Sequence, residues 1–379
     1  MIIKSISIRK ILNSAAAYTI ETTITLGDGS TGIASIPGGI SKGTSEVATL
    51  SPNEAIKRVG DIKNELDGKD FKSLKDLDDY LIQLDGTANK SKLGGNTTLS
   101  ISMATAKAHA KSLKLETYEY IHMILNPDVP VTEVEFRIPQ MMMLILEGGL
   151  HGGGSASIQE FMAIVDNVDR GLEIYKNVEN ELRRLSKSTN VGAEGAFSPQ
   201  GYDNDQVLSL LTGYLHGEKI AIDVAANSFA EMPNNPQLPN YDVLLKNYPI
   251  ASIEDPYRED DWVNWELFGN RYTENLIVVT DDLTTTNPKL LQEAINKDVG
   301  NAILVKPNQI GTVSETLRVI DLARQNGWQI VVSHRGTDTN DDFIADLAVG
   351  AGAEFVKFGA PSRGERVAKY NRLLEIEES

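Results

Sequence analysis

Side chains alternate in character along the first part of the chain, which is the pattern of a β-strand. Over residues 18–26, mostly apolar positions alternate with threonine and glutamate, and this period of two is typical of a half-buried strand. Asp28 and Gly29 follow, and residues 33–36 are largely apolar again. We therefore predict a β-hairpin that turns at Asp28 and Gly29.

A helical pattern begins after the hairpin. Ser51 can cap a helix, Pro52 fits its first position, and Glu54 completes a capping box. Further helical patterns cover residues 74–84, 99–113 and 116–124. Strands followed by helices predict an α+β domain over residues 1–130.

The pattern changes in the remainder of the chain. Short apolar runs alternate with helical stretches, which indicates parallel strands covered on both faces. The runs occupy residues 221–224, 250–254, 276–281, 302–306, 329–334 and 355–357. We therefore predict a second domain of the α/β class over residues 131–379.

Each of these six runs ends in a charged or titratable side chain. These side chains are Asp223, Glu254, Asp281, Lys306, His334 and Lys357. Their spacing fits one strand, one helix and two loops, which need about 30 residues. Six such units would bring the side chains to the carboxyl-terminal end of the strands, where a (β/α)8 barrel has its active site. The alternative is that strand ends are polar because they leave the sheet, which accounts for one such residue more readily than for six.

The order of these side chains indicates a metal site next to a basic site. Carboxylates from neighbouring strands raise one another's pKa unless a cation lies between them. Mg²⁺ prefers oxygen ligands and leaves positions for substrate and water. Lys306 and Lys357, together with Arg335, can hold an anion or remove a proton. We expect a lysine near cations to have a lowered pKa and to act as a base.

Two glycine-rich segments lie upstream of these strands. Residues 147–154 include His151, and residues 192–197 place Glu194 among small residues. Glycines around a histidine indicate a loop that can close over a ligand. A surface turn explains the first segment taken alone, and a helix-capping loop explains the second.

Composition argues against several classes of protein. The chain has 36 Lys+Arg against 53 Asp+Glu, a net charge of −17, so it lacks the basic surface that nucleic acid requires. It has no cysteine, which excludes disulfides, a thiol nucleophile and cysteine-ligated metals. No stretch approaches the ~20 apolar residues of a membrane span, and the amino terminus lacks the apolar core of a signal peptide. We expect a cytoplasmic protein that binds neither membrane nor nucleic acid.

Eight segments, in order through nearly the whole chain, resemble enolase, the phosphopyruvate hydratase of glycolysis. They include LDGTANKSKLGGN (84–96), GGLHGGGSASIQEFM (148–162), AIDVAANSF (221–229), SIEDPYREDDW (252–262), DDLTTTNP (281–288), LVKPNQIGT (304–312), VSHRGTDT (332–339) and KFGAPSRGERVAKYN (357–371). The resemblance implies a modified (β/α)8 TIM-type barrel with an amino-terminal α+β capping domain. It also implies the reversible dehydration of 2-phosphoglycerate to phosphoenolpyruvate in glycolysis and gluconeogenesis.

The resemblance assigns a role to each candidate site residue. Those matching metal ligands are Asp223, Glu254 and Asp281. Those matching catalytic groups are Glu194, Lys306, Glu160, His334 and Lys357. Those matching substrate contacts are His151, Gln159, Arg335, Lys357 and Ser41. Lys306 would take the proton beside the carboxylate and Glu194 would protonate the departing hydroxyl. Enolase-superfamily enzymes use a lysine or histidine base with one or two Mg²⁺, and the resemblance implies two here, the second arriving with substrate.

The chain departs from the family at supporting positions. These are Ala15, Leu144, Glu147, Ala193 and Gly336. Ala15 replaces an arginine that ties subunits together, and the chain ends at Ser379 without the usual tail, so we expect any homodimer to have an altered interface. Two alternatives to an enolase remain open: a divergent paralogue with weak or no turnover that acts as a binding protein, and a Mg²⁺-dependent dehydratase of another acid. Retention of both Lys306 and Lys357, together with His334, Arg335 and Glu160, favours an enolase.

Overall fold

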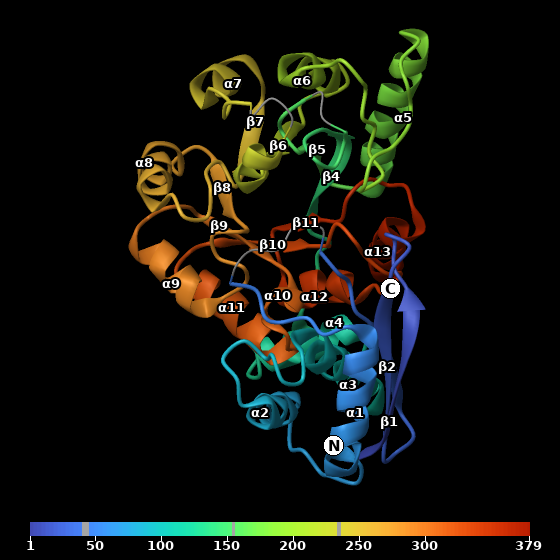
Figure 1. Cartoon of the computed structure of the whole chain (residues 1–379). Helices are drawn as coiled ribbons and strands as arrows, with labels where there is room; N and C mark the ends of the chain where they lie inside the picture. Colours follow the sequence, from blue (N-terminus) through green and yellow to red (C-terminus); the bar gives the residue numbers. More distant parts are fainter. Residues whose placement is uncertain (40–44, 154–155, 233–235) are drawn as a thin grey trace.

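The computed structural model describes residues 1–39, 45–153, 156–232 and 236–379 (Figure 1). The amino-terminal part begins with an antiparallel sheet in the order β1 (Ile3–Leu12), β2 (Tyr18–Leu26) and β3 (Thr31–Ser35). The predicted hairpin is therefore confirmed. Its strands are β2 and β3.

Four helices follow this sheet. They are α1 (Pro52–Leu66), α2 (Leu74–Asp85), α3 (Gly95–Ser112) and α4 (Thr117–Leu125). The predicted capping box at the start of α1 is confirmed, because Ser51 and Glu54 each bond the other's backbone N–H. Helix α3 packs against β2 and β3. This contact requires Gly32, since a Cβ there would lie 2.0 Å from the carbonyl oxygen of Ala104.

The rest of the chain forms a closed eight-stranded barrel. The strands are β4 (Gln140–Glu147), β5 (Glu160–Val165), β6 (Lys219–Asp223), β7 (Ile250–Glu254), β8 (Ile277–Thr280), β9 (Ala302–Val305), β10 (Gln329–Ser333) and β11 (Phe355–Lys357). Around the barrel they follow the order β10-β11-β4-β5-β6-β7-β8-β9. The six apolar runs of the sequence are β6 to β11. The predicted fold, a modified (β/α)8 barrel with an amino-terminal α+β part, is confirmed.

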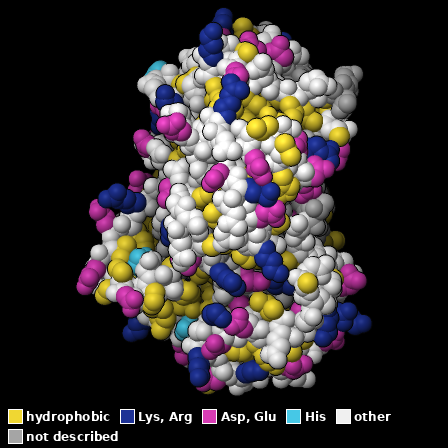
Figure 2. Space-filling model, turned by 90° about the vertical axis from the view of Figure 1, so that its left-hand side faces the viewer, with side chains coloured by type: hydrophobic (Ala, Val, Ile, Leu, Met, Phe, Trp, Pro, Cys, Tyr) yellow, Lys and Arg dark blue, Asp and Glu magenta, His cyan; other side chains and the backbone are white. Residues whose placement is uncertain are grey.

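Helices connect most of the barrel strands. They are α5 (Val168–Arg184), α6 (Asn204–Thr212), α7 (Tyr241–Asn247), α8 (Trp262–Tyr272), α9 (Pro288–Asn296), α10 (Pro307–Ile310), α11 (Val313–Gln325), α12 (Phe343–Ala351) and α13 (Gly364–Glu377), with the 3₁₀ helices η1 (Val131–Glu133) and η2 (Ala226–Glu231). In the described residues, no helix has the length and apolarity that crossing a membrane demands. Acidic and basic side chains are interspersed on the face seen in Figure 2.

Strand β5 departs from the parallel sheet that the sequence predicted. It runs antiparallel to both β4 and β6. No helix lies between β4 and β5 in the described residues, and an antiparallel pair needs no helical crossover. As a result, the first residue of β5, Glu160, lies at the same end of the barrel as the last residues of β4 and β6, Glu147 and Asp223.

Hydrogen bonds fasten the amino-terminal helices to the barrel near the predicted site. Thr98 on α3 donates to the carbonyl oxygen of Gly311 (2.7 Å), and Ser102 accepts from the backbone N–H of Val313 (2.9 Å). Asp78 on α2 accepts from the backbone N–H of Ser314 (2.9 Å). These bonds fix the start of α11, and thereby the segment that follows Lys306.

Candidate active site

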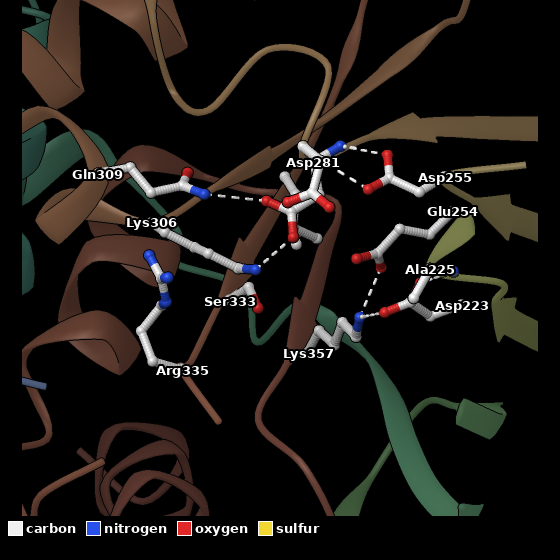
Figure 3. Close-up of polar contacts among 12 residues, drawn as sticks. Asp223, Ala225, Glu254, Asp255, Asp281, Lys306, Gln309, Ser333, Arg335 and Lys357 are labelled. Atoms are coloured by element: carbon white, nitrogen blue, oxygen red, sulfur yellow. Dashed lines mark hydrogen bonds and ion pairs between the residues drawn. The ribbon is translucent and has the colours of Figure 1, made fainter. Parts of the chain in front are cut away.

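The structure brings the predicted strand-end side chains together at one end of the barrel, and Figure 3 shows all of them except His334. Asp223, Glu254 and Lys357 are the last residues of β6, β7 and β11, and the other three directly follow β8, β9 and β10. A cavity opens among them. Its lining includes the predicted residues His151, Gln159, Glu160, Glu194, Asp223, Asp281, Lys306, His334, Arg335 and Lys357. Ser41 lies outside the described residues.

Lys357 neutralises a group of buried carboxylates. Its Nζ atom lies 2.6 Å from Glu254 Oε2, 3.0 Å from Asp223 Oδ2 and 3.3 Å from Glu160 Oε2. Burial alone would lower the pKa of Lys357, but these three carboxylates raise it well above its usual range. The lysine is therefore held in its charged form, as a buried ion-pair network requires.

Lys306 forms a second ion pair in the site. Its Nζ atom lies 2.5 Å from Asp281 Oδ2, and Gln309 donates to the other Asp281 oxygen over 3.1 Å. Burial acts to lower the pKa of Lys306, but Asp281 outweighs it and raises the pKa. The expected lowering of the lysine pKa depends on cations beside the lysine, whereas the charge that contacts Lys306 here is the Asp281 carboxylate.

The acidic side chains suit a hard divalent cation. Burial and the charge of Asp223 raise the pKa of Glu254 well above its usual range. Glu254 Oε1 is buried and has no hydrogen-bond partner among the described residues. Such a group is costly unless a positive charge reaches it. An oxygen-rich site with an uncompensated buried acceptor fits Mg²⁺-type chemistry.

The predicted metal ligands are divided between the two lysines. Asp281 contacts Lys306, while Asp223 and Glu254 share Lys357. Two other sets of described side chains have candidate ligand atoms within 4.8 Å of one another. They are Asp255, Asp281 and Asp282, and His151, Glu160 and Glu194. A cation bound by the predicted ligands would compete with lysine for the same carboxylate oxygens.

Glu194 lies on the loop between α5 and α6 and is buried. His334 Nε2 lies 3.0 Å from one of its oxygens, and His151 Nδ1 lies 3.8 Å from the other. On the other side of the His334 ring, Arg366 Nη1 lies 2.8 Å from Nδ1. Burial lowers the pKa of His334 to about 4. Glu194 thus faces a neutral histidine, and no lysine or arginine pairs with it among the described residues.

Arg335 binds a carboxylate in a two-pronged arrangement. Its Nη2 and Nη1 atoms lie 2.9 and 3.2 Å from the two oxygens of Glu46, and Nη1 also donates to Asn308. A guanidinium that engages a carboxylate in this way has the geometry to engage a phosphate. The structure therefore gives Arg335 an anion-binding geometry at the place where the resemblance implied a phosphate contact.

Several residues that shape the site were not predicted as part of it. Gln309 and Arg366 lie inside segments that carry the family resemblance, but nothing in the sequence indicates a catalytic role for either side chain. Arg366 is fully buried, which is rare for an arginine without partners. Glu46 could not be placed by spacing, since it follows none of the six predicted strands. Glu147 was named only as a supporting position of the glycine-rich segment, without a role of its own.

Comparison with known proteins gives matches over nearly the whole length of the chain. The family model described as Enolase, N-terminal domain, matches residues 3–121, and that described as Enolase, C-terminal TIM barrel domain, matches residues 135–240 and 231–379. A protein named Enolase from Anaplasma phagocytophilum (strain HZ) is 38% identical over 413 residues, covering 99% of this chain and 94% of that protein. Another named Enolase, from Elusimicrobium minutum (strain Pei191), is 37% identical over 409 residues, covering 99% and 96%.

Proposed function

The chain belongs to the enolase family, and we propose that it catalyses the Mg²⁺-dependent, reversible dehydration of 2-phosphoglycerate to phosphoenolpyruvate. This activity is that of a phosphopyruvate hydratase, a carbon–oxygen lyase. Membership in the family implies a metal-dependent enzyme that acts on a small phosphorylated substrate. The observation that carries the proposal is that Lys306 and Glu194 line one cavity yet belong to separate hydrogen-bond networks.

Lys306 is the proposed base. The proton next to a carboxylate is very weakly acidic, so its removal needs a positioned base and stabilisation of the charge that develops. Lys306 must release its own proton before it can accept another. Its present partner, Asp281, is also a proposed metal ligand, so metal binding and the hold on Lys306 depend on the same carboxylate.

Glu194 is the proposed acid that protonates the departing hydroxyl. It is buried and lies against His334 and His151. Glu160 is its proposed helper, and burial raises the pKa of this carboxyl well above its usual range. A carboxyl with a raised pKa is better suited to pass a proton toward a leaving group than one with an ordinary pKa.

Asp223, Glu254 and Asp281 are the proposed ligands for Mg²⁺. The bound metal would neutralise negative charge on the substrate carboxylate as the proton leaves. The family resemblance supports two ions per site, the second arriving with substrate. Ser41, His151, Gln159, Arg335 and Lys357 are the proposed substrate contacts. Of these, Arg335 would bind the phosphate in place of Glu46.

The formation of phosphoenolpyruvate tests this proposal. The purified protein is given 2-phosphoglycerate with and without Mg²⁺, and the product is followed by its ultraviolet absorbance. We expect turnover that requires the metal and is lost in Glu194→Gln. A folded protein that binds Mg²⁺ but does not turn over would favour the alternatives, a binding paralogue or a dehydratase of another acid. Screening of other hydroxy acids would then separate these two.

Three expectations from the sequence remain predictions. They are the domain boundary at residues 130 and 131, a cytoplasmic location, and a homodimer with an altered interface. Ala15 lies in the turn between β1 and β2, where its backbone N–H donates to the side chain of Asn13. It is exposed there.

A further inference from the structure

Glu147 is a buried carboxyl that holds the loop of the proposed acid. It is the last residue of β4 and is 2% exposed. One of its oxygens accepts from the backbone N–H of Glu194 over 3.3 Å, and the other accepts from the backbone N–H of Ala196 over 3.2 Å. A single side chain therefore spans the peptide units on both sides of Gly195.

The packing around this carboxyl leaves the loop little room to shift. A Cβ added to Gly192 would lie 2.4 Å from Glu147 Oε1 and 2.6 Å from the carbonyl oxygen of His151. The backbone N–H of Ala193 donates to that same His151 oxygen over 3.2 Å. The segment that carries His151 and the segment that carries Glu194 thus meet at the Glu147 side chain.

The backbone of β4 extends this attachment. The backbone N–H of Glu147 donates to the carbonyl oxygen of Phe197, and the N–H of Phe197 donates to that of Ile145. Main-chain hydrogen bonds therefore hold one part of the loop against strand β4, and the Glu147 side chain holds the part that carries Glu194. The main-chain bonds to β4 end at Phe197, three residues beyond Glu194. At the acid itself, Glu147 accepts from the backbone N–H of Glu194, while the backbone N–H of Ala360 donates to the carbonyl oxygen of Glu194 over 3.2 Å.

The charge state of Glu147 is compatible with this role. Within the described residues no lysine, arginine or histidine forms an ion pair with it. Burial and the neighbouring Glu194 carboxyl raise the pKa of Glu147 to about 8. At neutral pH the group is therefore largely uncharged, and it adds little negative charge next to the acid.

We infer that Glu147 is a positioning residue for the elimination half of the reaction: it fixes the backbone of Glu194, and thereby the direction of the acid toward the departing hydroxyl. The inference rests on the proposed function. The inference predicts different effects on the two proton transfers, because no contact joins Glu147 to Lys306 among the described residues. Loss of the Glu147 contacts should weaken protonation of the leaving group and spare removal of the carbon-bound proton.

The test compares two rates in the same protein. One is phosphoenolpyruvate formation, and the other is exchange of the proton at carbon 2 of 2-phosphoglycerate with deuterated solvent, followed by NMR. In Glu147→Ala we expect phosphoenolpyruvate formation to fall by about 10- to 100-fold, because small displacements of a catalytic group have effects of that size. Proton exchange should stay close to the parent rate. Glu147→Gln should give a smaller loss, since its amide can accept only one of the two N–H bonds.

Asp85→Asn is the matched control. Asp85 is also a buried carboxyl whose two oxygens accept backbone N–H groups, from Thr87 and Leu93, but it lies at the end of α2 in the amino-terminal part of the chain. This variant should lower the melting temperature without changing the ratio of the two rates. Equal losses of both rates in the Glu147 variants, or no loss in either, would overturn the inference. A parent protein with neither rate would instead overturn the proposed function.

Discussion

Arg366 donates a hydrogen bond from Nη1 to Nδ1 of His334 over 2.8 Å, and this contact fixes where the histidine carries its proton. A guanidinium has donors only, so Nδ1 must act as the acceptor. The ring proton of the neutral histidine then lies on Nε2, which is 3.0 Å from Glu194 Oε2. Arg366 thereby directs the ring proton of His334 toward the proposed acid.

This arrangement predicts how His334 contributes to stability at different pH values. Its pKa is lowered to about 4 by burial, whereas an exposed histidine has a pKa of about 6.5. Between these values the unfolded chain binds more protons at this position than the folded chain. The contribution of His334 is therefore fully present above about pH 6.5 and is lost as the pH falls toward 4.

Urea unfolding of the parent and of His334→Gln between pH 4 and 8 measures this effect. Glutamine can accept from Arg366 and donate to Glu194, so it keeps the polar contacts without the titration. We expect the parent to lose more free energy of unfolding than the variant as the pH falls. Parallel pH profiles for the two proteins would contradict the assignment of a neutral His334.

Lys306→Ala should abolish exchange of the carbon 2 proton of 2-phosphoglycerate, because no other proposed base is placed to remove it. Mg²⁺ binding, measured by calorimetry, should persist and should not weaken, since Asp281 loses a competing partner. Lys297→Ala is the control, because Lys297 is a surface lysine that pairs with Glu266. Its exchange rate should equal that of the parent. Persistent exchange in Lys306→Ala would remove this lysine from the role of base.

Lys357→Met should destabilise the metal-free protein. The substitution leaves Asp223, Glu254 and Glu160 without the cation that contacts all three, and breaking a buried ion pair costs about 3–5 kcal/mol. Added Mg²⁺ supplies positive charge to the same carboxylates. Thermal unfolding with EDTA and with Mg²⁺ should therefore show a larger metal-induced rise in melting temperature for the variant than for the parent. An equal rise in both would argue against Asp223 and Glu254 as ligands.

Gly192→Ala should lower the free energy of unfolding by about 1–3 kcal/mol, the usual cost of forcing extra volume into a packed site. The new methyl group would meet both the carboxyl of Glu147 and the carbonyl oxygen of His151. Gly60→Ala on helix α1 is the matched control, since a Cβ at Gly60 meets open space. That change should be neutral or stabilising, because alanine favours a helix over glycine. Similar free energies of unfolding for the two variants, measured with urea, would show that the loop can shift to make room for the new methyl group.

The sequence predicted much of the site because apolar runs mark strands and strand ends mark the catalytic end of a barrel. Asp223, Glu254 and Lys357 lie where the spacing placed them, at the ends of β6, β7 and β11. The direction of β5 could not be predicted in this way. A short apolar run reads the same in a parallel and in an antiparallel strand, and only pairing with its neighbours decides between them.

Contacts between distant segments explain the other differences. The pairing of Arg335 with Glu46, and of Lys306 with Asp281, depends on side chains 289 and 25 residues apart. Hydropathy along the chain carries no information about such pairs. The pKa of Lys306 likewise follows the Asp281 carboxylate that contacts it, and the pattern of residues along the chain does not reveal that contact.

The reversed strand β5 has a consequence for folding fidelity. Glu147, Glu160 and Asp223 stand opposite one another on three consecutive strands, so one row across β4, β5 and β6 joins the acid loop to the proposed metal ligands. A slip of β5 by one residue would turn Glu160 out of the barrel and bring Phe161 into its place. Such a misaligned molecule could keep its helices, its barrel and its circular dichroism spectrum. The misaligned molecule would nonetheless be inactive, and only an activity measurement on refolded protein would detect the misalignment.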